Sequence, residues 1–110
     1  MPRPRSRSRR TTSKPKVLTS FRCLAGEVVT SSGFGRTLSI GDEEVMLESP
    51  DAFPVGQVLD LEFLLDDNQI AGARGHVTRI NKGKGLYRVK IEFDKLPAKS
   101  RRLLARQVAG

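Results

Sequence analysis

The sequence lacks most of the residue types on which enzyme chemistry depends. Its 110 residues include one cysteine, one histidine and no tryptophan. Cys23 cannot form an internal disulfide, which agrees with a reducing compartment, and its place in an apolar alternation predicts a buried thiol. No nucleophile or base stands at a recognisable spacing from Cys23 or His76. We therefore expect no enzyme activity, and a structural role for His76.

Membrane and metal signals are also missing. No run of about 18 apolar residues occurs, so the sequence predicts neither a membrane span nor a secretory signal, and a cytoplasmic protein is the default expectation. The acidic clusters at 42–44 and 66–67 lack the alternating oxygen spacing of a calcium loop. We expect solvated turns there and no metal site.

Acidic residues are absent from the first 22 positions, which hold eight basic side chains. Residues 23–110 hold twelve charges of each sign, so the formal net charge of +8 belongs to this head. Like-charge repulsion, low hydrophobicity and three prolines by position 15 predict a disordered, arginine-rich arm over residues 1–15. Residues 16–110 have a length suited to one domain.

Beyond the arm, apolar and polar residues alternate with a period of two, which is typical of half-buried strands. The run 17–29 reads as one strand that bends at Gly26, and "TSSGFG" after it reads as a turn. Residues 36–48 are expected to form a hairpin around "GDE". The proline-containing loop "SPDAFPVGQ" follows, and three further strands are predicted at 58–65, 70–80 and 86–93.

The last segment changes to a helical period. Pro97 suits a first helical turn, and Leu104 and Val108 are one turn apart, so we expect a short helix at about 97–108. Six short antiparallel strands and one helix predict an all-β fold, a small β-barrel with the helix over one opening.

The arm carries the strongest chemical signal. Arginine is a permanently charged fork that binds phosphate bidentately and can also contact guanine O6 and N7. The arm therefore suits a phosphate-bearing guanine ligand. A solvated tail that binds any polyanion is the alternative that charge alone favours.

Four segments, in order, resemble a known family: "GRTLSIGDEEVMLES", "FPVGQVLDLEF", "GHVTRI" and "GLYRVKIEFDKL". From about Arg9 to Leu96 the sequence is similar to a PilZ domain, the bacterial receptor module for cyclic di-GMP. In that family a basic arm with Arg-x-x-x-Arg precedes a six-stranded barrel that carries an Asp/Asn-x-Ser-x-x-Gly motif. The resemblance implies cyclic di-GMP as the ligand and a protein partner for output.

The arm matches the first motif in more than one register. Arg5 and Arg9 match it literally, as do Arg3 and Arg7. The distance to the first strand favours Arg10 and Lys14, a pair in which lysine keeps the charge and loses the bidentate fork. The resemblance thus assigns ligand binding to Arg5, Arg9, Arg10 and Lys14.

The second motif is degraded under either of two alignments. One places Ser39 at the Asp/Asn position, Gly41 at the serine and Glu44 at the glycine, and the downstream strand favours it. The other keeps Ser39 as the serine and leaves Thr37 for the acid and Asp42 for the glycine. Ser39 and Gly41 complete the expected ligand-binding set.

Glu44 would bring a carboxylate close to two bound phosphates. Such a contact costs on the order of 1 to 3 kcal/mol, roughly 10- to 100-fold in affinity. One hypothesis is that the acidic turn pairs with the protein's own arm and so gates the site or substitutes for the ligand. The other is an exposed turn with no partner.

Three functions stay open on the sequence. The first is a cyclic di-GMP receptor or adaptor that signals to a partner protein. The second is a degenerate PilZ module that has lost the nucleotide and acts through protein contacts, for which the resemblance implies motility or surface behaviour. The third, nonspecific nucleic-acid binding, is disfavoured because only Phe34 and Phe53 are left as candidate stacking platforms.

Overall fold

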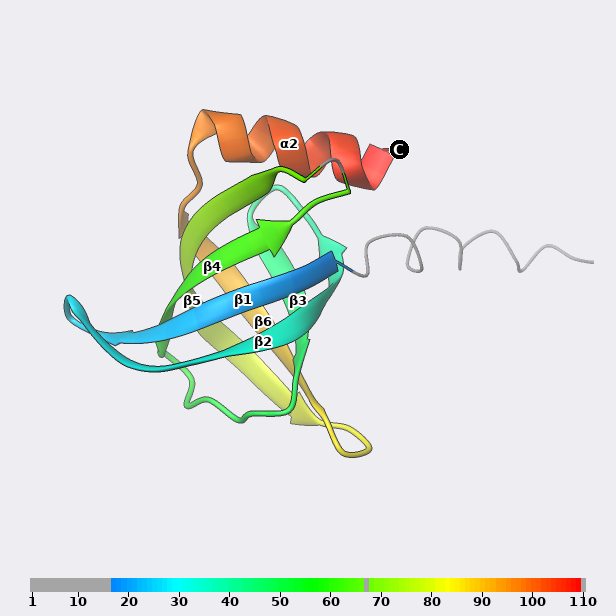
Figure 1. The fold of residues 1–110 in the computed structure, drawn as a ribbon. Coiled ribbons are helices and arrows are strands. Elements are labelled where there is room, and N and C mark those ends of the chain that lie inside the picture. Colours follow the sequence, from blue (N-terminus) through cyan, green and yellow to red (C-terminus); the bar gives the residue numbers. More distant parts are fainter. Residues whose placement is uncertain (1–16, 67, 110) are drawn as a thin grey trace, which may run out of the picture.

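The computed structural model describes residues 17–66 and 68–109, with side chains as far as Gln107. It consists of six strands and a helix that follows them (Figure 1). The elements are β1 (Val17–Ala25), β2 (Val28–Ile40), β3 (Glu44–Ser49), β4 (Val58–Leu64), β5 (Ile70–Lys82), β6 (Tyr87–Lys95) and α2 (Ala98–Ala109). The predicted arm over residues 1–15 lies outside the described residues.

The six strands form a closed antiparallel barrel in the order β1-β2-β3-β6-β5-β4. The predicted all-β barrel with a C-terminal helix is therefore confirmed. Inward positions of β1 alternate with outward ones, with Phe21 and Cys23 buried and Arg22 exposed, as the period of two predicts. Within the part of the chain that the structure describes, no helix is long and apolar enough to span a membrane.

The prediction for residues 17–35 was wrong in one respect. The chain reverses at Gly26 and Glu27, between the paired residues Ala25 and Val28, and Gly26 has a φ of 64°. Glycine at positive φ in the first position of a two-residue loop is typical of a hairpin turn. The segment "TSSGFG", expected to be a turn, instead lies inside the 13-residue strand β2.

Close packing explains the glycines in this segment. A Cβ atom on Gly33 would lie 2.8 Å from Cζ of Phe21, and one on Gly35 would lie 2.5 Å from the carbonyl oxygen of Glu48. These glycines give room to neighbouring groups within the sheet, so they are not turn residues here. Gly75 of β5 likewise lies against the backbone of Glu92.

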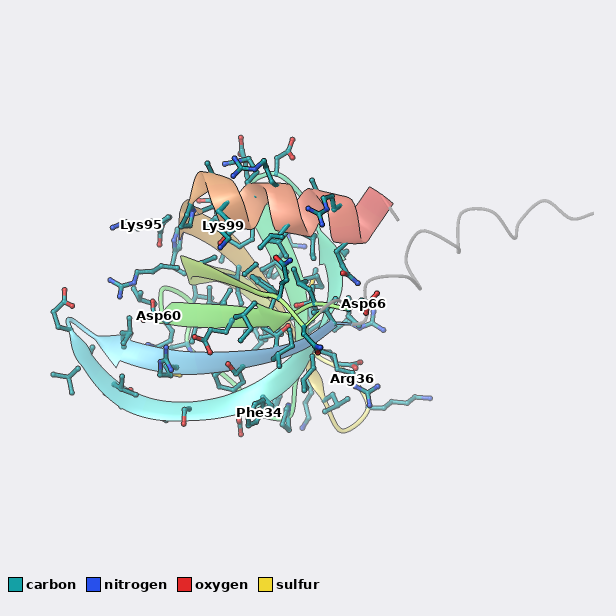
Figure 2. All side chains as sticks on the ribbon, turned by 45° about the horizontal axis from the view of Figure 1, so that its top comes forward. Phe34, Arg36, Asp60, Asp66, Lys95 and Lys99 are labelled. Carbon is teal, nitrogen blue, oxygen red and sulfur yellow. The ribbon has the colours of Figure 1, made fainter. Side chains whose placement is uncertain are left out.

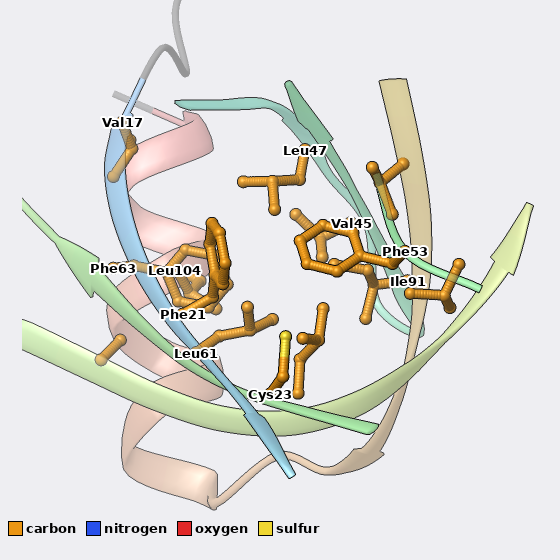
Figure 3. Close-up of a cluster of buried hydrophobic side chains, with 14 of the residues drawn as sticks. Val17, Phe21, Cys23, Val45, Leu47, Phe53, Leu61, Phe63, Ile91 and Leu104 are labelled. Carbon is orange, nitrogen blue, oxygen red and sulfur yellow. The ribbon is translucent and has the colours of Figure 1, made fainter. Parts of the chain in front are cut away.

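The interior of the barrel is apolar and is closed at both ends (Figure 3). At one end, Leu103 and Leu104 of α2 insert into the core cluster. At the other end, Phe53 from the loop 50–57 packs edge-on against Phe21, with ring centroids 5.1 Å apart. Cys23 lies in this interior with 5% of its surface exposed, as the sequence predicted.

The helix covers one opening of the barrel, in agreement with expectation (Figure 1). It starts directly after Pro97, whose carbonyl accepts a hydrogen bond from the amide of Arg101 at 2.9 Å. The hydroxyl of Ser100 accepts one from the amide of Gly72 at 3.1 Å, which fastens the helix to β5. Near its other end, the Gln107 amide donates to Asp66 at 3.1 Å.

Candidate functional site

The predicted site residues of the barrel meet at the β2–β3 hairpin. Ser39 is exposed near the end of β2 and pairs with Met46 across a register shift. The amide of Gly41 donates to the carbonyl of Glu44 at 2.8 Å and so closes the turn. A Cβ atom on Gly41 would find Glu44 at 3.5 Å, an ordinary contact. The turn therefore leaves a shallow, open corner beside Ser39.

Glu44, the residue suspected of gating, has a partner within the barrel. Its carboxylate lies 3.3 Å from Nζ of Lys90 on β6, with 50% of the Glu44 side chain exposed. An ion pair this open contributes up to about 1 kcal/mol. The carboxylate is thus partly neutralised by Lys90. Whether the arm also reaches it lies outside the described residues.

Thr37, which takes the acid position in the second alignment, faces the barrel interior. Its side chain is fully buried, and its hydroxyl lies 2.7 Å from that of Thr19 on β1. Since the Thr19 hydroxyl donates to the carbonyl of Val17, Thr37 must be the donor between the two. Of the short polar side chains in the two alignments, Ser39 therefore faces solvent and Thr37 does not.

The structure brings the start of the arm close to this hairpin. Val17, the first described residue of β1, pairs with Thr37, two positions before Ser39. Arg5, Arg9, Arg10 and Lys14 themselves lie outside the described residues. Lys14 is three residues from Val17, a span of at most about 11 Å for an extended chain. Because the arm is joined to β1, its C-terminal end cannot be far from Ser39.

The described groups around the turn are mainly acidic. A cavity of about 310 Å³ beside the hairpin is lined by the carboxylates of Asp42, Glu43, Glu92 and Asp94 and by the guanidinium of Arg101. These carboxylates carry the same sign of charge as a phosphate and repel it. An anion at this corner therefore needs cations from elsewhere in the chain, and the arginine-rich arm carries them.

The turn also touches the helix. Nη1 of Arg101 donates to the carbonyl of Asp42 at 3.3 Å. A second cavity, of about 250 Å³, lies between Gly41 and Asp42 on the hairpin and Leu104 and Ala105 on α2. A change in the hairpin's conformation would therefore act directly on α2, through the contact between Asp42 and Arg101.

The one histidine and the one cysteine lie on β5 and β1, outside the β2–β3 hairpin. Nδ1 of His76 lies 2.9 Å from Asp94 across the β5–β6 pair, a contact that joins two strands, as expected for a structural histidine. Among the residues that the structure describes, no group of three or more metal-ligating side chains converges. The free thiol of Cys23 is buried.

A larger cavity of about 450 Å³ lies on the β4–β5 face near the start of α2. Two of its three basic side chains are paired: Nε of Arg74 lies 2.7 Å from Asp60, and Arg22 lies 3.9 Å from Glu62. The hydrogen bond that the Arg74 guanidinium donates to Asp60 raises the pKa of Arg74 above its ordinary value. The third, Lys95, has no ion pair among the described residues, so this cavity keeps one cation, and it lies away from the β2–β3 hairpin.

Two exposed residues lie on the outside of β2: Phe34, one of the two candidate stacking platforms, and Arg36, which the sequence did not single out. Phe34 is 61% exposed, and Arg36 is exposed on the same face, next to Glu48 of β3 (Figure 2). Because "TSSGFG" was read as a turn, the face of Phe34 was not considered. Phe53, the other candidate stacking platform, is buried in the core. Phe34 is thus the one aromatic residue of those two that is open to a ligand.

A model of the PilZ domain family matches residues 5–110. The chain therefore belongs to the PilZ domain family, as the resemblance predicted. PilZ domains are regulatory binding modules of the cyclic di-GMP receptor type, which act through a partner. The matched range includes the arginines at positions 5, 9 and 10.

Among solved structures, the chain is similar to the Bacillus subtilis inhibitor of motility, MotI/DgrA, with a TM-score of 0.64. Sequence identity is 13%, and the alignment covers 86% of this chain and 48% of MotI/DgrA. The chain thus spans about half the length of that protein, and the likeness shows the fold. No curated protein sequence matches.

Proposed function

We propose that the protein is a cyclic di-GMP receptor that passes the signal to a partner protein. The observation that carries the proposal is that β1, to which the arm is covalently joined, begins beside the β2–β3 hairpin. The family match begins at residue 5, and β1 begins beside Thr37, next to the exposed Ser39. In this scheme Arg5, Arg9, Arg10 and Lys14 bind the phosphates, and Ser39 meets the guanine edge.

Gly41 contributes through its missing side chain and not through a free amide. Its N–H already bonds to Glu44 within the turn, and the absence of a side chain lets a ligand approach the backbone closely. Closure of the arm over the hairpin would change the surface beside Arg101 and α2, which the turn contacts. The partner would read that change, and a cytoplasmic location belongs to the same proposal.

The test is a calorimetric titration of the full chain with cyclic di-GMP, repeated while backbone amide NMR shifts are recorded. We expect saturable binding with shifts at Ser39 and Gly41, and loss of binding when Arg9 and Arg10 are both replaced by alanine. Arg102→Ala serves as the matched control, since Arg102 is exposed on α2. Full affinity in the Arg9/Arg10 double variant would overturn the site assignment.

The second candidate is a PilZ module that no longer binds the nucleotide. It is favoured by the carboxylates at 42–44, which repel a phosphate. It is also favoured by the Glu44–Lys90 ion pair, because Lys90 is then already engaged and less available to a phosphate. On this hypothesis no shift occurs at high cyclic di-GMP concentration, and output depends on a protein partner alone. The name of MotI/DgrA, an inhibitor of motility, supports a search for that partner among motility proteins.

A further inference from the structure

One part of β2 has a neighbouring strand on one side only. β3 pairs with β2 from Arg36 to Ile40, whereas β1 pairs with it along nearly its full length. Within the described ranges, residues 28–34 therefore have an open edge on the side away from β1, while Gly35 already lies against the backbone of Glu48. β3 ends at Ser49, and Pro50 follows. Since proline has no N–H to donate, the ladder cannot continue past this point.

This edge has little of the protection that open strand edges usually have. Natural edges are blocked by charged residues, proline or bulges. Residues 28–35 read "VVTSSGFG", with no charge and no proline, in a chain that is 29% charged. A bulge leaves Thr30 without a partner on β1. From Ser31 to Phe34 the edge is regular, and the side chain of Phe34 is 61% exposed.

A groove runs along the open edge. A cavity of about 430 Å³ lies between residues 30–32 of β2 and residues 51–54 of the following loop, and Phe21, Cys23 and Phe53 also line it. An inward-pointing side chain of an added strand would therefore meet a mixed surface, with hydroxyls of β2 and the Asp51 carboxylate around the edges of Phe21 and Phe53. The β1–β2 hairpin projects beyond the barrel, so the edge is accessible from its tip (Figure 1).

The loop 50–57 limits what can occupy this groove. A Cβ atom on Gly33 would lie 3.2 Å from Oδ2 of Asp51, so the loop closely approaches β2 there. One extended chain would fit between β2 and the loop. A second copy of the protein that paired through its own β2 would also bring its β1, and this β1 would fall where the loop lies. The geometry therefore favours a single strand over pairing between two barrels.

The charges at the groove favour a basic occupant. The carboxylate of Asp51 points toward Gly33, and the described residues supply no ion pair for it. Glu27 adds a second carboxylate at the hairpin tip, where it is exposed. A lysine or arginine in the occupant would meet these groups, with more gain where the groove excludes water.

We propose that residues Ser31–Phe34 accept one extended, basic segment of a partner protein as an additional antiparallel strand in line with β3. Backbone hydrogen bonds to β2 supply affinity, a small or apolar side chain enters the groove over Phe21 and Phe53, and a lysine or arginine meets Asp51. This surface goes beyond the proposed nucleotide site. It lies in the middle of β2, five to eight residues before Ser39, and needs no cyclic di-GMP.

The probe is a displayed library of random nine-residue peptides, selected on the full chain without nucleotide. We expect enrichment of extended sequences with lysine or arginine. Hydrogen exchange followed by NMR should show new protection at alternate amides between Ser31 and Phe34, because every second residue of an edge strand points outward. Asp51→Asn should weaken the selected peptides by about 3- to 10-fold, as expected for one partly exposed charge pair.

Two further variants complete the test. Ser31→Lys places a charge on the edge and should abolish binding, while Glu43→Gln removes a carboxylate at the other end of the barrel and should have no effect. Equal binding to the Ser31→Lys variant, absence of basic enrichment, or protection elsewhere would overturn the proposal. Alternate-amide protection in the free chain that disappears when residues 1–16 are removed would assign the edge to the arm instead.

A second copy as the occupant would also contradict the proposal. Sedimentation of the free chain would then show a dimer, and Ser31→Lys would dissociate it. Because no nucleotide is present, failure of this experiment says nothing against cyclic di-GMP binding. Conversely, a chain that does not bind the nucleotide could still bind the selected peptides.

Discussion

At the scale of the residue, Glu44 determines how the hairpin meets an anion. The sequence alone predicts a penalty for a carboxylate beside two phosphates. The structure reduces the expected penalty for two reasons: half of the side chain is exposed, and Lys90 lies 3.3 Å away. Solvent and the neighbouring ammonium both screen the carboxylate.

The first prediction concerns this carboxylate. Glu44→Gln removes the negative charge and releases Lys90, so the affinity for cyclic di-GMP should rise by about 3- to 10-fold at low salt, about 1 kcal/mol. The gain should shrink as the salt concentration increases. Calorimetry measures both effects. The control is Glu48→Gln, because Glu48 lies on the same outward face of β3, four residues further along. An equal gain in affinity for this variant would mean that only the total charge of the protein matters.

The second prediction separates the two alignments of the degraded motif. Thr37→Asp would place a carboxylate in the barrel interior, where Thr37 is fully buried, and should lower the free energy of unfolding by about 3 kcal/mol or more. Ser39→Asp should change it by less than about 0.5 kcal/mol, because Ser39 is exposed. Urea unfolding compares them. Equal stability of the two variants would contradict the inward position of Thr37.

Sequence reasoning could place Ser39, Gly41 and Glu44 together because a tight hairpin is a local structure. It could not find the Lys90 partner of Glu44, since that contact depends on β6 lying beside β3. The roles of these residues and of the arm in ligand binding stay predictions. The arm residues named for phosphate binding lie outside the described residues.

At the scale of the element, most strands follow from the alternation of apolar and polar side chains. β4 and β6 show it clearly, and each was predicted to within a few residues. β2 was not predicted in full, because serine and glycine are typical of turns. Contacts with β1 and the loop override that preference, and no local pattern in "TSSGFG" reports those contacts.

The third prediction concerns α2 as the closure of the barrel. Leu104 is 2% exposed and belongs to the core cluster. Leu104→Ala should lower the free energy of unfolding by about 2 to 4 kcal/mol, because it leaves a cavity beneath the helix. Thermal and urea unfolding give the value. Arg102→Ala, on the exposed side of α2, should have almost no effect, because alanine keeps the helix propensity, and a similar loss there would contradict a specific role for the Leu104 core contact.

At the scale of the whole molecule, charge is divided between the two parts of the chain. Seven of the twenty lysine and arginine residues lie within residues 1–16, and 17–110 holds thirteen basic and twelve acidic side chains. The arm therefore carries nearly all of the net charge. Charge alone would make it a general binder of polyanions.

The fourth prediction separates charge from arginine chemistry. Replacing Arg3, Arg5, Arg7, Arg9 and Arg10 together by lysine keeps every charge and removes the bidentate fork. Affinity for cyclic di-GMP should fall at least about 10-fold, since two or more strong phosphate contacts are weakened. Retention on heparin should stay almost unchanged. A parallel loss on heparin, or none with the nucleotide, would favour a general polyanion binder.

The burial of Cys23 has a practical consequence. It is the sole cysteine in the chain, and it faces the barrel interior beside the groove under β2. A thiol reagent can reach it only when that end of the molecule opens, so the labelling rate counts opening events in the unmodified protein. The labelling rate of Cys23 thus reports on this end of the barrel without any engineered probe. A molecule bound along β2 should lower that rate.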